Sequence, residues 1–193
     1  MTAATPKGER RRHALVEAAV ALLAEGGLEA VRHRAVADRA GLPLASTTYY
    51  FTSLDDLVAA AVEHEGRTEI AAGRARLDEL ADERRTVEDV VELLLDLLLG
   101  VDSRDGGTEP VLLRYERLVG SPRRPYLAPL MRELTGELKD LLDEILARSG
   151  MPVDREQLDE LIALVDGTVV NALIESGPDP RSAARRTLRR RLG

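Results

Sequence analysis

The chain of 193 residues is long enough for one large domain, or for a small domain joined to a medium one. Apolar residues make up 44% of it and aromatic residues only 3%, so we expect an interior of leucine, valine, alanine and isoleucine. Cysteine is absent, which excludes disulfides and thiol chemistry and fits a cytoplasmic protein. The first residues lack the apolar segment of a signal peptide. The most apolar run, residues 90–99, contains two carboxylates, so we expect no membrane span.

The net charge of −7 argues against nonspecific coating of nucleic acid, but the charge is unevenly distributed along the chain. Residues 1–54 hold seven lysines or arginines and five acidic residues, which gives a net charge of +2. The rest of the chain carries 20 basic and 29 acidic side chains, a net charge of −9. This distribution predicts a small cationic segment, able to approach phosphate, attached to an acidic body.

The N-terminal part predicts an arm followed by a helix. Residues 1–8 are small, polar and aperiodic, and we expect them to be flexible. A helix is predicted over residues 9–25, because apolar side chains recur there at helical spacing and Gly26 and Gly27 follow. Arginines stand at its start, where cations oppose the helix dipole. A DNA phosphate is therefore a candidate partner for Arg12, and an ordinary solvated basic end is the alternative.

Residues 32–51 predict two short helices joined by a turn. Val36, Ala37 and Ala40 recur at helical spacing, and Gly41 can take the left-handed backbone conformation that a tight turn needs. The second helix, residues 44–51, is rich in hydroxyl groups, which suit base edges and phosphate oxygens in a major groove. The pattern indicates a helix-turn-helix that reads DNA.

Further residues accompany this pattern at fixed positions around it. They are Ala18, Leu22 and Leu23, the Gly26-Gly27-Leu28 break, Tyr49, Phe51, Ser53 and Leu57. Together with the two helices, and over about residues 8–62, they strongly resemble the N-terminal domain of TetR-family transcriptional repressors. The resemblance implies DNA contacts at Arg34, Leu44, Ser46, Thr47, Thr48, Tyr49 and Tyr50.

Alternatives remain for some of these side chains, and the chain departs from the family pattern in places. Arg34 could instead form a surface ion pair with Glu29 or Asp38, and one of the two adjacent tyrosines could pack against the first helix. Leu54 stands where many members have a phosphate-binding lysine, and Thr48 where a tyrosine is usual. Pro43 and Arg32 replace the residues that usually cap the two helices of the motif. These departures leave the DNA-binding prediction in place, and the contacts that the resemblance implies are defined to within a residue or so.

Beyond residue 53 the sequence predicts helices and loops, with no strand. Ser53 caps a long helix that ends near residue 80, and Thr86 with Asp89 opens a buried helix over 87–99. Loops are expected at 100–107 and around Pro122 and Pro125. Further helices are expected at 109–120, 126–149, 155–176 and from about 180 onward. The predicted fold is all-α with about nine helices. A three-helix DNA-binding domain at residues 1–53 is joined by the long helix to a ligand-binding and dimerisation bundle at 54–193.

The helix predicted over residues 155–176 has a long apolar stripe with small residues in it, which would let a second subunit approach closely. The resemblance implies the same pairing, a homodimer that presents two reading units to a palindromic operator. The alternative is that the stripe belongs to the chain's own core. The residues assigned to the dimer interface are Leu158, Leu161, Ile162, Val165, Val169 and Leu173.

The resemblance also implies a small-molecule pocket in the helical body, whose occupancy releases DNA and so relieves repression. Polar or aromatic groups that interrupt apolar faces are the guide to it, and each has an ordinary core or interface role as its alternative. The candidates are Tyr115, Tyr126, Met131, Asp166 and Asn171. The low aromatic content favours an aliphatic or small effector.

The C-terminal helix is rich in arginine, and Arg181, Arg185 and Arg189 fall on one face of it. We expect that face to meet acidic groups of the body or of a partner subunit, with a second DNA contact as the alternative.

Two other classes of function agree less well with the sequence. For an enzyme, the chain offers no cysteine, no phosphate-binding glycine loop and no histidine pair at metal-ligand spacing. His64 between Glu63 and Glu65 is the nearest approach to a cluster, so no catalytic residue, metal or cofactor is assigned. The second rival is a helical adaptor that binds protein in place of DNA. The basic residues around the motif favour phosphate over that alternative.

Overall fold

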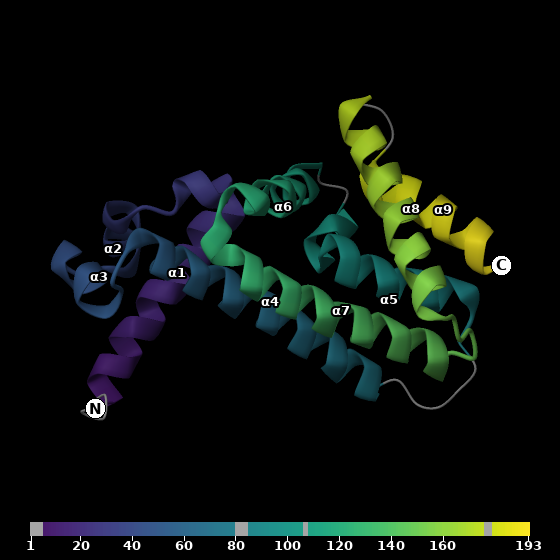
Figure 1. Ribbon diagram of the computed structural model, residues 1–193, viewed down its shortest axis with the longest axis horizontal. Coiled ribbons are helices and arrows are strands. Elements are labelled where there is room, and N and C mark those ends of the chain that lie inside the picture. Colours follow the sequence, from purple (N-terminus) through teal and green to yellow (C-terminus); the bar gives the residue numbers. More distant parts are fainter. Residues whose placement is uncertain (1–5, 80–84, 106–107, 176–178) are drawn as a thin grey trace. The chain divides into compact units, whose positions relative to one another are not determined.

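The computed structural model describes residues 6–79, 85–105, 108–175 and 179–193, which form nine α-helices and three short 3₁₀ helices and include no strand (Figure 1). The elements are α1 (Pro6–Ala30), α2 (His33–Ala40), α3 (Leu44–Tyr50), α4 (Leu54–Glu79), α5 (Val87–Leu99), η1 (Val101–Asp105), α6 (Thr108–Gly120), η2 (Ser121–Arg123), η3 (Pro125–Leu127), α7 (Ala128–Arg148), α8 (Arg155–Ile174) and α9 (Pro180–Leu192). The predicted all-α fold is confirmed. None of the described helices is long and apolar enough to cross a membrane.

The chain forms two compact units, and the first consists of Met1–Arg67 and Tyr115–Arg132. Its core includes Leu15 of α1, Val36 of α2 and Leu57 of α4, none of them exposed at all. The predicted stop at Gly26 and Gly27 occurs as a kink inside α1, where Gly27 has a φ of 65°. Only glycine adopts that conformation without steric cost, so Gly27 sets the direction in which the chain continues.

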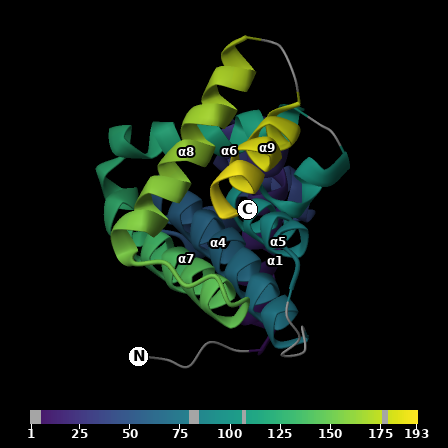
Figure 2. The same ribbon diagram turned by 90° about the vertical axis from the view of Figure 1, so that its right-hand side faces the viewer.

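The second unit consists of Thr68–Arg114 and Glu133–Gly193. Its interior is built from aliphatic side chains of α5, α7 and α8, as the composition indicates. In this unit α9 packs on both α8 and α5 (Figure 2). Gly73 of α4 allows a close approach, because a Cβ there would lie 2.5 Å from Leu97 and 2.9 Å from Leu141.

Helix caps lie where the sequence predicts them. The hydroxyl of Ser53 accepts a hydrogen bond from the backbone N–H of Asp56 at 3.1 Å, which caps α4. Thr86 and Asp89 form a reciprocal capping box at the start of α5. Each such cap satisfies backbone donors that a helix start leaves without partners, so the sequence defines these starts closely.

Several predicted boundaries are wrong by a few residues. The arm was expected to extend to residue 8, but α1 begins at Pro6, because proline fits the first turn of a helix, where no backbone donor is needed. Residues 1–5 lie outside the described residues. In the predicted loop at 100–107, residues 101–105 form a 3₁₀ helix, and 106–107 are not described. The prolines at 122 and 125 each sit in a 3₁₀ turn, so α7 starts at Ala128, two residues later than expected.

The two packing units do not coincide with the predicted division at residues 53 and 54. The first unit continues along α4 to Arg67 and also takes in Tyr115–Arg132. The assignment of DNA binding to residues 1–53, and of ligand binding and dimerisation to 54–193, stays a prediction about function.

Candidate functional site

The turn between α2 and α3 has the geometry that the sequence predicts. Gly41 ends α2 with a φ of 63° and a ψ of 31°, the left-handed conformation. The N–H of Leu42 then donates to the carbonyl of Ala37 at 3.0 Å, and the N–H of Gly41 to that of Asp38 at 3.2 Å. These bonds close the end of α2 and direct the chain into α3 within three residues.

The seven residues of α3 divide into buried anchors and exposed side chains. Thr47 is fully buried and its hydroxyl donates to the carbonyl of Leu44 at 2.8 Å. Phe51, which follows the helix, is 1% exposed. The assignment of Thr47 as a DNA contact is therefore wrong, because its side chain lies in the core of the unit. Thr47 instead fixes α3 against that core.

The exposed side of α3 carries the remaining predicted contacts. Tyr49 is 81% exposed and Leu44 52%, large values for side chains of this size. Thr48 is exposed as well, while Ser46 and Tyr50 are half-buried. The rings of Tyr49 and Tyr50 meet edge to face, with 4.8 Å between their centroids. With the exposed Ala45, the surface of α3 that is open to a partner therefore combines two apolar groups, one hydroxyl group and one phenol.

The starts of α2 and α3 lack side-chain caps, as their sequence indicates. Arg32 precedes α2 and Pro43 precedes α3, and neither side chain accepts a hydrogen bond from its helix. The Nε of Arg32 donates instead to the carbonyl of Glu29 at 3.1 Å.

Basic side chains around the motif divide into paired and outward-facing ones. Glu29 pairs with Arg124 at 2.5 Å and with Arg32 at 4.0 Å, so it does not take up the predicted pairing with Arg34. Arg34 itself is exposed at the start of α2. Arg12 is exposed on α1, and its guanidinium carbon lies 5.1 Å from the ring centroid of Phe51, a cation–π distance.

Arg39 is held by a carboxylate of the same unit. Its Nη1 and Nη2 donate to the two oxygens of Glu25 at 2.8 and 2.5 Å. These hydrogen bonds lower the pKa of Glu25 and raise that of Arg39. Because this bidentate pair joins α1 to α2, Arg39 contributes to the position of the reading unit more directly than to its outer surface.

The residues predicted to bind a ligand do not gather in one place. Tyr115, Tyr126 and Met131 belong to the first unit, and Asp166 and Asn171 to the second, so no single cavity within one unit holds all five. Tyr115 is 6% exposed and Asn171 is exposed. Burial raises the pKa of Tyr126, and the charge of the Asp55 carboxylate adds to this.

A hollow in the second unit lies among α5, α7, α8 and α9. It has room for about one water molecule and is partly open to solvent. Its lining is entirely aliphatic: Leu94, Leu98, Leu142, Leu146, Leu158, Leu161, Ile162 and Leu188. None of the five predicted ligand residues lines it. Polar and aromatic residues were the guide to a pocket in the sequence. That guide could not find this hollow, because its lining has no polar group.

The residues predicted for a dimer interface lie mostly inside the chain's own second unit. Leu158, Leu161, Val165 and Val169 are at most 4% exposed, and Ile162 and Leu173 are half-buried. Buried side chains cannot contact a second copy, so the structure supports the alternative that the stripe is core. The exposed side of α8 instead carries Leu164, Gly167, Val170 and Ile174.

Comparison with known proteins identifies the family. A family model described as "Bacterial regulatory proteins, tetR family" matches residues 15–61, and one described as "Tetracyclin repressor-like, C-terminal domain" matches residues 85–193. No curated protein matches the chain.

Solved structures give the same result. The multidrug binding protein EbrR complexed with proflavin is 30% identical, with 93% of this chain and 98% of EbrR covered and a TM-score of 0.66. A TetR-family member from Streptomyces coelicolor A3 is 28% identical over 95% of this chain and 98% of its own, with a TM-score of 0.63. A TetR transcription regulator from Haloarcula marismortui ATCC 43049, at 20% identity, shares the fold with a TM-score of 0.72 over 95% of this chain and 97% of its own. The chain belongs to the TetR family of bacterial regulatory proteins, in which a helix-turn-helix unit is joined to a helical C-terminal domain.

Proposed function

We propose that this regulator is a repressor that binds a palindromic operator as a homodimer and leaves it when a small-molecule effector binds. The proposal of DNA binding rests on one observation: the side chains of α3 divide into buried anchors and exposed groups. Thr47 and Phe51 are buried, while Leu44, Thr48 and Tyr49 face outward on a helix that follows a left-handed turn. A helix held in this way can present a fixed pattern of groups to base edges.

The exposed basic side chains support the same reading. Arg12 and Arg34 lie on α1 and α2 of the same unit and are exposed. Phosphate contacts set the position of a DNA-binding protein, whereas base contacts specify the sequence. We therefore assign Arg12 and Arg34 to phosphate and the outer side of α3 to bases.

A homodimer is proposed through the exposed side of α8. Leu164, Val170 and Ile174 are 44%, 38% and 73% exposed, and Gly167 lies on the same side at helical spacing. A Cβ at Gly167 would meet no atom within 4 Å, so the chain's own packing does not require a glycine there. A second copy packed against this row would account for both the exposed apolar groups and the small residue between them.

For the effector, the hollow lined by leucines and isoleucine is the candidate site. Ligand pockets for drug-sized molecules usually enclose about 300 to 1,000 Å³, whereas this hollow has room for about one water molecule. A lining without polar groups favours an aliphatic ligand. The similar structures of EbrR contain proflavin and ethidium, so a family relative accepts those compounds. In this chain a ligand of that size would need the hollow to widen.

The first test is selection of bound sequences from a random pool of double-stranded DNA, with protein that has been unfolded and refolded to remove bound small molecules. We expect a palindrome with half-sites about 10 base pairs apart, or a multiple of this, and affinity that falls steeply between two salt concentrations. Absence of any enriched sequence would overturn the proposal and favour the helical adaptor that binds protein.

Once an operator is known, small molecules can be screened by release of the labelled DNA. Transcription from the same operator, measured with and without the protein, then distinguishes repression from activation. Release by an aliphatic compound, lost when a wall of the hollow is filled by Leu161→Phe, would support the assignment of the effector site. Release that is unaffected by Leu161→Phe would place the effector elsewhere.

A further inference from the structure

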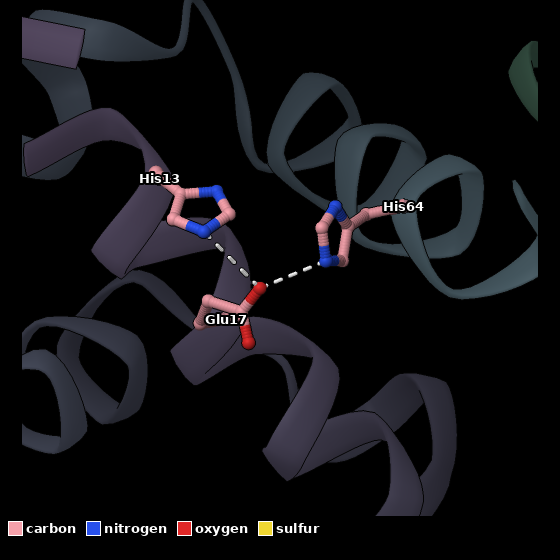
Figure 3. A group of neighbouring side chains, drawn as sticks. All are labelled: His13, Glu17 and His64. Carbon is pink, nitrogen blue, oxygen red and sulfur yellow. Dashed lines mark ion pairs between the residues drawn. The ribbon is translucent and has the colours of Figure 1, made fainter. Parts of the chain in front are cut away.

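Two histidines and a glutamate that are distant in sequence converge in the first unit. His13 and Glu17 are one turn apart on α1, and His64 comes from α4 (Figure 3). The Nε2 of His64 lies 2.8 Å from Oε1 of Glu17, and the Nε2 of His13 lies 3.5 Å from the same oxygen. The two imidazole rings meet edge to face, with 5.5 Å between their centroids.

The arrangement has the chemistry of a transition-metal site. One potential ligand atom from each side chain lies within 4.8 Å of the other two. Zn²⁺ binds imidazole nitrogen and carboxylate oxygen at about 2.0 to 2.2 Å, which places neighbouring ligand atoms of a tetrahedral site roughly 3.3 Å apart. The set reaches that spacing by rotation of its side chains, two of which are exposed and one half-buried. Two imidazoles and one carboxylate also leave positions for water, as in sites with three protein ligands.

Access and helix geometry support the same conclusion. The side chains of His13 and Glu17 are 64% and 52% exposed and that of His64 is 34% exposed, so an ion can reach all three from solvent. Residues four apart on a helix share one face, which fixes His13 and Glu17 as a pair regardless of the rest of the fold. His64 completes the set only because α4 folds back beside α1 (Figure 3).

We propose that His13, Glu17 and His64 bind one divalent transition-metal ion of the class of Zn²⁺, Co²⁺ or Ni²⁺. On binding, the ion takes the place of the close contact between Nε2 of His64 and Oε1 of Glu17, and each imidazole binds it through the Nε2 lone pair of the tautomer that carries its proton on Nδ1. The residues of α2 and α3 lie between His13 and His64 in the chain, so the ion cross-links the segments that flank the reading unit. Because such a site exists only in the folded chain, the ion stabilises this unit against unfolding.

The test uses the full chain without a histidine tag, freed of metal by a chelator. Co²⁺ is added while its visible ligand-field absorption is followed, and Zn²⁺ affinity is then measured in competition with a coloured chelator. The variants are His13→Gln, Glu17→Gln and His64→Gln. The control is His33→Gln, since His33 is the remaining histidine of the chain and lies outside the cluster. Circular dichroism and the thermal midpoint verify that each variant is folded.

We expect the wild-type chain and His33→Gln to bind one equivalent with the same affinity. Each of the three ligand variants should weaken binding by more than about tenfold. Zn²⁺ should raise the thermal midpoint of the wild type and of His33→Gln, and raise it less in the ligand variants. Equal affinity in the wild type and all three ligand variants would overturn the proposal, as would absence of stoichiometric binding to the wild type. None of these readouts depends on DNA binding.

Discussion

The guanidinium of Arg181 lies 2.8 Å from the carboxylate of Asp96, and these side chains are 1% and 5% exposed. Arg181 also donates to Glu92 at 2.7 Å and to the hydroxyl of Ser103 at 2.8 Å. Asp96 in turn accepts from Arg104 of η1. The buried carboxylate of Asp96 and the half-buried carboxylate of Glu92 thus join α5 to Arg181 of α9. The arginine-rich helix meets acids of its own body, as its sequence pattern predicts.

Replacement of Arg181 by methionine should destabilise the fold. The change leaves Asp96 buried with fewer partners, and breaking a buried ion pair usually costs about 3 to 5 kcal/mol. We expect about 3 kcal/mol, because Arg76 and Arg104 still pair with Asp96. The measurement is the free energy of unfolding in urea. Arg186→Met, an exposed position on the same helix, is the control and should change stability by less than about 0.5 kcal/mol.

The same cluster makes stability depend on pH. Hydrogen bonds from Arg185, and then from Arg181, lower the pKa of Glu92. Burial alone would raise the pKa of Asp96, but Arg104 and Arg181 outweigh it and lower that pKa. The unfolded chain, with ordinary values of about 4.3 and 3.9, then binds more protons than the folded one, so stability rises with pH. The contribution is complete above the unfolded values and is lost as pH falls through the lower, folded ones.

We therefore expect the free energy of unfolding to fall as pH is lowered from about 6 to 3. Glu92→Gln removes one of the two groups, so its stability should fall less steeply over this range. A variant with the same pH slope as the wild type would show that Glu92 does not contribute.

Tyr49→Ala should weaken operator binding by about 1 to 3 kcal/mol and leave the unfolding free energy nearly unchanged, because Tyr49 is 81% exposed. Affinity for the selected operator, by fluorescence anisotropy, provides the measurement. Val119→Ala is a matched control, since Val119 is 68% exposed in the same unit and lies outside the reading helices. An unchanged affinity in Tyr49→Ala would remove the outer side of α3 from the reading surface.

Arg34→Ala should act differently, because we assign its charge to a phosphate. Affinity should fall to a similar extent for all sequences, and the slope of log affinity against log salt should decrease by about one. Titrations of operator and of unrelated DNA at several salt concentrations measure both quantities. A loss confined to the operator would instead place Arg34 at a base edge.

The sequence predicted those features that depend on neighbouring residues. The left-handed turn at Gly41 and the capping box opened by Thr86 are local, and the structure has them where they were expected. The burial of Thr47 was missed, because a hydroxyl in a short helix gives no sign that its helix face lies against the core. The cluster around His64 was missed for a related reason: it depends on the packing of α4 beside α1, which no spacing in the sequence records.

The apolar stripe on α8 shows the same limit of a prediction from sequence alone. Its apolar periodicity is real, yet it serves the chain's own core, and the dimer surface that we propose is the row of Leu164, Gly167, Val170 and Ile174. Gly167→Leu should convert a dimer to monomers, because the added side chain blocks close approach of a second helix. It should not destabilise the monomer, since a Cβ there meets nothing within 4 Å and leucine favours helix more than glycine does.

Sedimentation velocity over a range of concentrations measures this equilibrium, together with the thermal midpoint of each form. Ile174→Glu should have the same effect by placing a charge in the interface, while Val119→Glu, at an exposed apolar position on α6, should leave the dimer intact. A wild-type chain that is monomeric throughout, or variants that dimerise as it does, would remove α8 from the interface. Monomers that still fold but no longer bind the palindrome would link the α8 row to operator recognition, because a single reading unit contacts only one half-site.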